Sequence, residues 1–140
     1  MGQRRLADYL IGDPVVTSLS HQADYSETLA LLPDCYQPTD ADRTADPTPS
    51  KRDAGLPEQG LVFCSFNQIY KITPVVFDVW CQILTAMPDS VLWLLEGPQT
   101  AMDNLRKEAQ QRGIAAERLI FAPKLTQAAH LGRLALADIA

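Results

Sequence analysis

The second half of the chain alternates between apolar runs of strand length and apolar stripes at helical spacing. Short β-prone runs occupy 61–66, 91–95 and 119–122, and helical patterns separate them. The continuous run at 91–95 is typical of a strand that is covered on both faces. Trp80 and Trp93 fall on faces that we expect to pack in the core. This order predicts an α/β fold with a parallel sheet and flanking helices.

The predicted helices carry recognisable end signals. Thr73 followed by Pro74 predicts an N-cap and then a proline at the first helical position, where its missing N–H costs nothing. A second helix is expected from Thr100 as its N-cap to residue 112, with Gly113 just beyond its end. A third helix is expected over 127–136, and the last three residues resemble the opening of another strand.

The composition divides the chain into three parts. Residues 1–36 mix short apolar runs with turn signals, whereas residues 61–140 hold the regular α/β pattern. Between them, residues 37–60 contain four prolines among Asp, Thr, Ser and Lys, with few large apolar side chains. Such a segment buries too little surface to offset its ordering entropy, so it is expected to be a linker or exposed loop.

The composition also disfavours several functional classes. A hydrophobic share of 46% with 21% charged residues is typical of a globular protein, and a net charge of −5 disfavours a nucleic-acid partner. No apolar run approaches the roughly 20 residues that cross a bilayer, so we expect no membrane partner and a cytoplasmic location. The three cysteines and two histidines have no metal-site spacing, and no phosphate-loop glycine pattern occurs. We therefore expect neither a metal nor a cofactor.

The segment 66–72, FNQIYKI, combines two amides, a phenol and a lysine between a predicted strand and a predicted helix. Ligands of parallel α/β sheets bind at this carboxyl edge of the strands. A lysine suits a phosphate group, and amides can orient sugar or phosphate oxygens. The alternative is a solvated connecting loop in which Tyr70 packs as a lid.

Several stretches occur in the order found in one known family. Residues 64–74 read CSFNQIYKITP, and VLWLL at 91–95 and IFAP at 120–123 follow them. Upstream, ADYLIGDP at 7–14 and the stretch from Tyr25 to Pro33 fit the same order. Together they resemble the C-terminal catalytic region of protein O-GlcNAc transferases and their SPINDLY-like relatives. The resemblance is collinear over nearly the whole chain apart from residues 37–60.

This resemblance implies a partial GT-B glycosyltransferase fold, in which two Rossmann-like lobes face each other. Residues 1–36 would be the tail of the first lobe, and residues 61–140 the first half of the second, nucleotide-sugar-binding lobe. The chain would then be truncated at both ends and inactive alone. The full-length parent would transfer GlcNAc from UDP-GlcNAc to Ser or Thr hydroxyls of proteins, without a metal. The helical repeats that usually capture acceptors in this family have no counterpart in these residues.

The resemblance also assigns the residues that would hold the donor's diphosphate and sugar. Gln68 and Lys71 match the glutamine and lysine that face this part of the donor in the family. Lys71 would be catalytic, because its charge would offset the negative charge that grows on the leaving diphosphate.

The nucleotide end of the site would come from the segment after the third strand. A histidine and an arginine at the spacing of His130 and Arg133 contact the base in the family, and Leu125 would do so through its backbone. Taken without the resemblance, His130 is an ordinary histidine on a helix face. Gln127 stands where many relatives carry a lysine.

Two other functions stay open at this point. Gln127 leaves room for a GDP-fucose-dependent protein O-fucosyltransferase of SPINDLY type, which a preference for GDP over UDP would reveal. The chain could also be a non-catalytic α/β interaction module. The effect of Lys71→Ala on nucleotide binding would separate that module from an enzyme.

Overall fold

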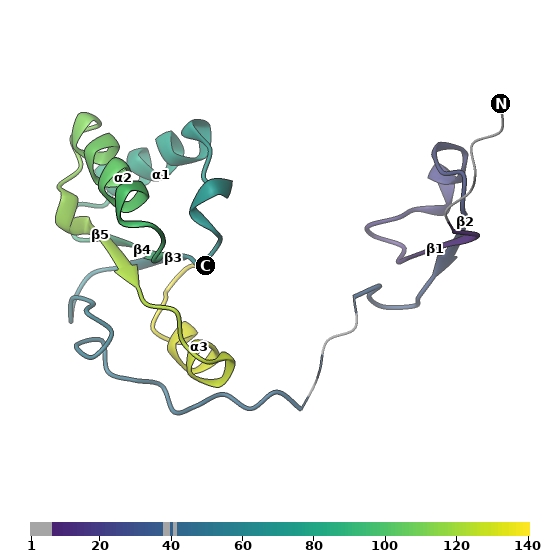
Figure 1. Cartoon of the computed structure of the whole chain (residues 1–140), viewed down its shortest axis with the longest axis horizontal. Coiled ribbons are helices and arrows are strands. Elements are labelled where there is room, and N and C mark those ends of the chain that lie inside the picture. Colours follow the sequence, from purple (N-terminus) through teal and green to yellow (C-terminus); the bar gives the residue numbers. More distant parts are fainter. Residues whose placement is uncertain (1–6, 38–39, 41) are drawn as a thin grey trace. The chain divides into compact units, whose positions relative to one another are not determined.

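The computed structural model describes residues 7–37, 40 and 42–140. The chain forms two compact units, of which the first ends at Asp42 and the second begins at Arg43. Figure 1 shows the helices and strands of each unit.

The first unit is built on two short parallel strands. Strand β1, Tyr9–Gly12, pairs in register with β2, Thr28–Leu31, and a 3₁₀ helix, Leu19–Asp24, lies in the crossover between them. The side chain of Gln22 ties this crossover to β2, because its Nε2 donates to the carbonyl of Glu27 and its Oε1 accepts from the N–H of Leu29.

Asp13 closes the turn that follows β1. Its Oδ1 accepts from the backbone N–H groups of Val15 and Val16, at 2.9 and 2.8 Å, and its Oδ2 accepts from that of Tyr36 at 3.0 Å. These bonds hold the pKa of Asp13 below its ordinary value; the N–H groups of Val16 and Tyr36 contribute most, and burial opposes them. The carboxylate of Asp13 therefore links the segment after β2 to the turn after β1 through hydrogen bonds.

The second unit contains a parallel sheet with the strand order β3-β4-β5. These strands are Val62–Ser65, Val91–Leu95 and Leu119–Ala122. The expected strand at the end of the chain is present as a single parallel β-bridge between Ile139 and Phe63. The N–H of Cys64 donates to the carbonyl of Ile139 at 2.7 Å. The predicted α/β fold with a Rossmann-like parallel sheet is therefore confirmed.

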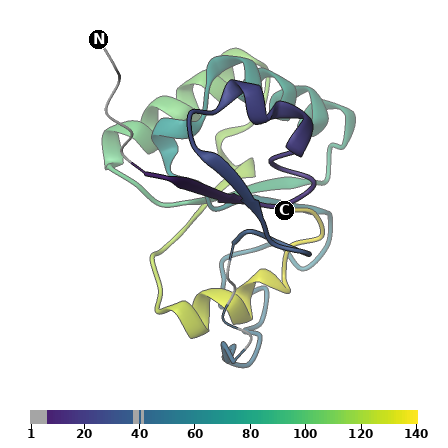
Figure 2. The ribbon, with the colours of Figure 1, turned by 90° about the vertical axis from the view of Figure 1, so that its right-hand side faces the viewer.

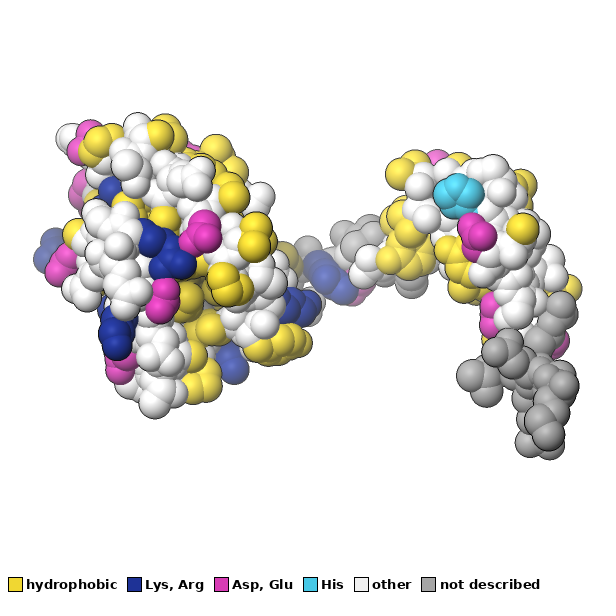
Figure 3. Space-filling model, turned by 90° about the horizontal axis from the view of Figure 1, so that it is seen from above, with side chains coloured by type: hydrophobic (Ala, Val, Ile, Leu, Met, Phe, Trp, Pro, Cys, Tyr) yellow, Lys and Arg dark blue, Asp and Glu magenta, His cyan; other side chains and the backbone are white. Residues whose placement is uncertain are grey.

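Helices cover both faces of this sheet. Helices α1, Pro74–Ala86, and α2, Gln99–Gln111, lie on one face, and α3, Gln127–Leu134, lies on the other (Figure 1, Figure 2). A short 3₁₀ helix, Ala116–Arg118, leads from α2 into β5. Arg112 joins α2 to α1, since it donates to Asp78 and to Glu108 at 2.6 Å each. On the face seen in Figure 3, basic and acidic side chains lie beside one another among hydrophobic ones.

Two of the predicted helix ends are confirmed and one is wrong. The Oγ1 of Thr73 accepts from the N–H of Val76, so Thr73 is the N-cap of α1, and Gly113 has a φ of +78° just after α2. Thr100 does not cap α2. That helix begins two residues earlier than this cap would place it, at Gln99 directly after Pro98, and the Nε2 of Gln99 donates to Asp103.

The alternating side chains of β4 divide the core into two clusters. Leu92 and Leu94 pack under α1 and α2, whereas Val91 and Trp93 pack on the opposite face. Trp93 is only 1% exposed. The expectation of a strand covered on both faces and of a buried Trp93 is confirmed.

The proline-rich segment, which its composition predicts to be a linker or exposed loop, has mostly exposed side chains and also packs in part on the second unit. From Arg43 onward it belongs to the second unit, and Leu56 is buried beside Val62 and Trp93. The N–H of Asp46 donates to the carbonyl of Ala128 in α3 at 3.0 Å. The segment therefore covers α3, because backbone hydrogen bonds and one buried leucine hold it although most of its side chains are exposed. The division into a first-lobe tail over 1–36 and a second lobe over 61–140 stays a prediction, and residues 1–6 lie outside the described part.

Candidate functional site

The strand order reverses at β3. The chain passes from β3 to β4 and β5 on one side, and then returns to the other side of β3 at Ile139. In open parallel sheets, ligands bind in the crevice at the carboxyl ends of the strands beside such a reversal. The loop that begins at Phe66 leaves β3 at that point, so the topology directs attention to the segment that carries Gln68 and Lys71.

This loop contains a single 3₁₀ helix, Ile69–Lys71. Gln68 precedes it in an extended conformation, and its carbonyl accepts from the N–H of Lys71 at 2.9 Å. The side chains of Gln68 and Lys71 are exposed and make no hydrogen bond or ion pair within the described part of the chain. They are therefore available to a ligand.

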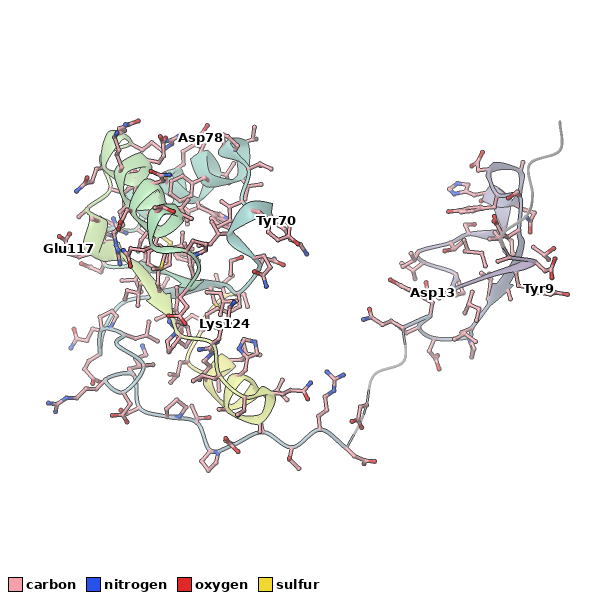
Figure 4. All side chains as sticks on the ribbon, viewed as in Figure 1. Tyr9, Asp13, Tyr70, Asp78, Glu117 and Lys124 are labelled. Carbon is pink, nitrogen blue, oxygen red and sulfur yellow. The ribbon has the colours of Figure 1, made fainter. Side chains whose placement is uncertain are left out.

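The two residues between Gln68 and Lys71 have different surroundings, because Ile69 packs against the protein and Tyr70 is exposed. A Cβ on Gly97 would lie 2.6 Å from the Cδ1 of Ile69, so Ile69 packs closely against the loop that follows β4. Tyr70 is 81% exposed and points away from the sheet (Figure 4). The alternative in which Tyr70 packs as a lid is therefore wrong for this structure.

His130 and Arg133 form a pair on α3, which begins where Thr126 caps the N–H of Ala129. Their i, i+3 spacing places them on one face of the helix. The Nε and Nη2 atoms of Arg133 lie 3.2 and 2.8 Å from the Nδ1 of His130, and Nη1 donates to the carbonyl of Pro123 at 2.6 Å. Arg133 is only 2% exposed. The structure thus brings these two predicted residues into direct contact.

Aromatic rings complete the surroundings of this buried guanidinium. The Cζ of Arg133 lies 4.4 Å from the centroid of the Phe66 ring and 5.8 Å from that of Trp93. Phe66 also meets Trp93 edge to face at 4.8 Å and lies 5.1 Å from the ring of His130. Phe66 therefore connects the loop of Gln68 and Lys71 to the pair on α3.

Burial lowers the pKa of two side chains in this cluster. Burial, and then the positive charge of Arg133, lower the pKa of His130, so its ring is neutral near pH 7. Burial also lowers the pKa of Arg133, while Cys64 and Glu96 act in the opposite direction. No carboxylate forms an ion pair with Arg133 in the described residues.

The loops after β4 and β5 meet beside this cluster. The N–H of Lys124 donates to the Oε1 of Glu96 at 3.1 Å, and Lys124 is labelled in Figure 4. Leu125 follows directly and is 47% exposed, and Gln127 is the first residue of α3. Among the described residues, no side-chain hydrogen bond joins Leu125 or Gln127 to the pair of His130 and Arg133.

The sequence arguments missed Phe66 and Trp93 as parts of this cluster. The sequence places Trp93 in the core alone, and it places Phe66 at the end of a strand and at the start of the candidate segment 66–72 without a role of its own. The one signal in the sequence is the place of Phe66, which is the last residue of the predicted strand at 61–66, at the edge of the sheet where ligands bind. Among the described residues, no three His, Cys, Asp or Glu side chains lie close enough together to hold a metal ion. No helix in the same residues is long and apolar enough to cross a membrane.

The parallel sheet, the reversal at β3 and the helices on both faces define a Rossmann-like α/β unit. The model of glycosyl transferase family 41 matches residues 43–140, which are the whole second unit. The chain belongs to this family, as the resemblance of its motifs implied.

Curated relatives extend the similarity over most of the chain. The chain is 37% identical over 138 residues to the probable UDP-N-acetylglucosamine–peptide N-acetylglucosaminyltransferase SEC of Arabidopsis thaliana, covering 94% of this chain and 14% of that protein. It is 40% identical over 84 residues to the corresponding transferase of Caenorhabditis elegans, covering 60% of this chain and 7% of that protein. A Petunia hybrida relative named SPINDLY is 31% identical over 140 residues, covering 94% of this chain and 14% of that protein.

A solved structure shares the fold. A mutant O-GlcNAc transferase of Thermobaculum terrenum superposes with a TM-score of 0.62 at 28% identity, over 86% of this chain and 23% of that one. The chain thus spans about a seventh of the length of the SEC and SPINDLY relatives.

Proposed function

We propose that this chain forms part of the donor-binding region of a protein O-GlcNAc transferase. The enzyme would move GlcNAc from UDP-GlcNAc to Ser or Thr hydroxyls of proteins. The bond from the anomeric carbon to the diphosphate breaks, a bond to the hydroxyl oxygen forms, and the hydroxyl proton is lost. Membership of family 41 and the names of the relatives support this reaction. The observation that carries it is the cluster at the reversal of the sheet, where Phe66 joins the loop of Lys71 to His130 and Arg133.

The exposed side chains of Gln68 and Lys71 would hold the diphosphate and sugar. The amide of Gln68 can both donate and accept, which suits sugar and phosphate oxygens. The ammonium of Lys71 would stabilise the charge that develops on the leaving diphosphate, so we assign it a catalytic role that needs no metal or cofactor. His130 and Arg133 would form the nucleotide end of the site, with the backbone of Leu125 beside them.

We place residues 1–36 in the first lobe of a GT-B enzyme and residues 61–140 in the second. Cys35, Cys64 and Cys81 are all unpaired in the described structure, which fits the reducing cytoplasm. Acceptor proteins and the nucleotide sugar are the partners that this function requires. The net charge of −5 favours neither nucleic acid nor an anionic membrane surface.

A GDP-sugar donor is the second candidate, because Gln127 replaces a lysine that many members of the family carry. Gln127 is exposed at the first position of α3, three residues before His130. A GDP-fucose-dependent enzyme would prefer GDP to UDP, and a non-catalytic module would bind neither nucleotide.

The first experiment is an NMR titration of the chain with UDP and, separately, with GDP. We expect saturable amide shifts with UDP at Gln68, Lys71 and His130. Lys71→Ala should weaken UDP binding roughly tenfold, on the order of 1.4 kcal/mol, because a charge-assisted contact to the diphosphate is lost. The matched control is Lys107→Ala, which removes an exposed lysine from α2.

The outcomes separate the candidates. A preference for GDP would assign the chain to the fucosyltransferase branch. Equal affinities of Lys71→Ala and Lys107→Ala for UDP would show that Lys71 has no role in donor binding. A well-dispersed spectrum that neither nucleotide perturbs would favour the interaction module.

A further inference from the structure

Thr48 presents its hydroxyl in a part of the proline-rich segment that the fold holds in place without enclosing it. Residues 43–50 form neither helix nor strand, and Thr48 is exposed. Two residues earlier, the N–H of Asp46 donates to the carbonyl of Ala128 at 3.0 Å. Among the described residues, no hydrogen bond involves the backbone or the hydroxyl of Thr48. The hydroxyl is therefore accessible to an enzyme that modifies the chain.

Prolines on both sides keep the backbone extended at Thr48. Pro47 precedes it and Pro49 follows it. A residue that comes before a proline is restricted to extended conformations, and this restriction applies to Thr48. The segment can therefore enter a cleft that binds extended polypeptide without first changing its backbone conformation at this residue.

The residues after Thr48 match the substrates of proline-directed protein kinases. These enzymes modify a serine or threonine that a proline follows, because their cleft has no acceptor for an N–H at that position, and a proline has none to offer. Many of them also bind a basic side chain three residues after the hydroxyl. Pro49 follows Thr48, and Lys51 is the third residue beyond it. Lys51 forms no ion pair within the described part of the chain, so its ammonium is available.

Thr73 is a second threonine that a proline follows, and the fold uses it differently. Its Oγ1 accepts from the N–H of Val76, and its carbonyl accepts from the N–H of Phe77 at 3.0 Å. Pro74 is the first residue of α1, and the third residue beyond Thr73 is Val76. Thr73 therefore belongs to a helix start and has no cation at the required distance along the chain.

We propose that Thr48 is a phosphorylation site for a proline-directed protein kinase, and that the phosphate weakens the contact between the proline-rich segment and α3. The hydroxyl oxygen of Thr48 forms a bond to the γ-phosphorus of ATP, and the bond from that phosphorus to the bridging oxygen of the leaving ADP breaks. The hydroxyl proton passes to a carboxylate of the kinase. Neither half depends on the nucleotide-binding roles proposed above.

The direction in which the segment crosses α3 determines what the phosphate does. The N–H of Asp46 bonds to Ala128 in the first turn of the helix. A Cβ on Gly132, one turn later, would lie 2.3 Å from the carbonyl oxygen of Asp46 and 3.3 Å from that of Pro47. The segment thus runs toward the carboxyl end of α3, where the helix dipole is negative. A phosphate on Thr48, with up to about two negative charges, is disfavoured there.

The basic residues near Thr48 act in the same direction. Lys51 and Arg52 follow it in the chain, and neither forms an ion pair among the described residues. Arg133 is the basic residue in the last turn of α3, but it is only 2% exposed. The phosphate therefore finds accessible cations on the proline-rich segment itself, and pairing with them draws it away from α3.

The test is phosphorylation of the whole 140-residue chain by a purified kinase of the cyclin-dependent class with Mg²⁺ and ATP. Tandem mass spectrometry should place one phosphate on Thr48, and none on Thr73 or on Ser50, whose hydroxyl donates to Asp53. A synthetic peptide of residues 42–54 is the control. Three results would overturn the site: equal rates at Thr73 and Thr48, no phosphate on either the chain or the peptide, and a peptide that is modified while the chain is not.

Four variants test the two recognition features. Pro49→Ala should slow the reaction on the order of tenfold, because its new N–H has no acceptor in the kinase. Pro47→Ala keeps Pro49 and is the matched control. Lys51→Ala should slow the reaction about tenfold, because a charge-assisted contact is lost, and Arg52→Ala is its control. A variant that reacts as fast as its control would contradict the role assigned to that residue.

Amide exchange tests the effect of the phosphate on the contact with α3. The N–H of Asp46 should exchange about two- to fivefold faster in the phosphorylated chain, because the docked position is disfavoured. The N–H of Phe77, in α1 on the opposite face of the sheet, should not change. Thr48→Val, treated with the same kinase, controls for the treatment itself. Exchange at Asp46 that phosphorylation leaves unchanged would overturn this half of the proposal.

Discussion

At the scale of single residues, Arg133 is a buried cation that has no carboxylate partner in the described structure. Burying a charge is costly unless hydrogen bonds or other favourable electrostatic interactions replace water. Here a carbonyl and an imidazole accept its N–H groups, and the faces of Phe66 and Trp93 provide cation–π contacts. Each of these groups is neutral, and the carboxylate of Glu96 acts on Arg133 only at longer range than an ion pair.

The lowered pKa of His130 predicts how stability depends on pH. As the pH falls below about 6.5, the unfolded chain takes up a proton at His130 while the folded chain does not, so folding stability decreases. This contribution is complete above that pH and declines until the folded ring titrates. Denaturation at a series of pH values should show the loss. In Arg133→Met the pKa of His130, measured by NMR titration, should rise because the neighbouring charge is absent.

Asp13 predicts a second dependence of folding stability on pH, in a more acidic range. Its folded pKa lies below the ordinary value of 3.8, so its contribution to stability is present above that pH and is lost as the pH falls through the folded pKa. Asp13→Asn should release Tyr36, because an amide NH₂ cannot accept its N–H. Faster amide exchange at Tyr36 is the expected result, with exchange at Val15 and Val16 little changed because the remaining Oδ1 still accepts their N–H groups, and with exchange in β4 unchanged. Protection of all three amides in the variant would contradict it.

At the scale of elements, local signals predicted much of the second unit. The run at 91–95 and the pair Thr73 and Pro74 act through short-range sterics and capping, which the sequence displays directly. Thr100 is not the cap, because the signal for a helix start directly after Pro98 is as local as the signal for a start after Thr100. The packing of residues 43–60 could not be predicted, since it depends on a hydrogen bond to Ala128 in an element far along the chain. The contact of Phe66 with Arg133 could not be predicted for the same reason, because it joins the loop after β3 to helix α3 only after the sheet has formed.

Gly132 offers a direct test of the packing between α3 and the proline-rich segment. A Cβ at this position would overlap the carbonyl oxygen of Asp46, so Gly132→Ala should destabilise the second unit by about 1–3 kcal/mol. The helix propensity gained from alanine, roughly 0.5–1 kcal/mol, acts in the opposite direction. Denaturant unfolding measures the difference, with Ala135→Ser as a control that adds one atom at an exposed position. A variant as stable as the control would mean that the segment does not pack on α3.

At the scale of the whole molecule, the two compact units divide the chain at residue 42. The second unit contains both hydrophobic clusters, all three strands of its sheet and every predicted site residue. The family match begins at the same boundary. The contacts described above between residues of the candidate site therefore all lie within the second unit.

A chain of residues 43–140 should consequently keep the fold of the second unit. Its amide spectrum should reproduce the shifts of β3, β4 and β5 and of the loop Asn67–Lys71 in the full chain. Comparison of the two ¹⁵N spectra is the measurement. Widespread changes in the sheet of the shorter chain would show that the first unit contributes to its stability.

The position of Trp93 gives the molecule an optical reporter. The chain has two tryptophans; Trp80 packs against the cluster under α1 and α2, whereas Trp93 lies on the opposite side of the sheet against Phe66 and within 5.8 Å of the Arg133 cation. Indole fluorescence responds to nearby charge and to contacts with its ring. Substituting Trp80 with phenylalanine would leave one emitter, whose wavelength and intensity report the state of the cluster without any added dye.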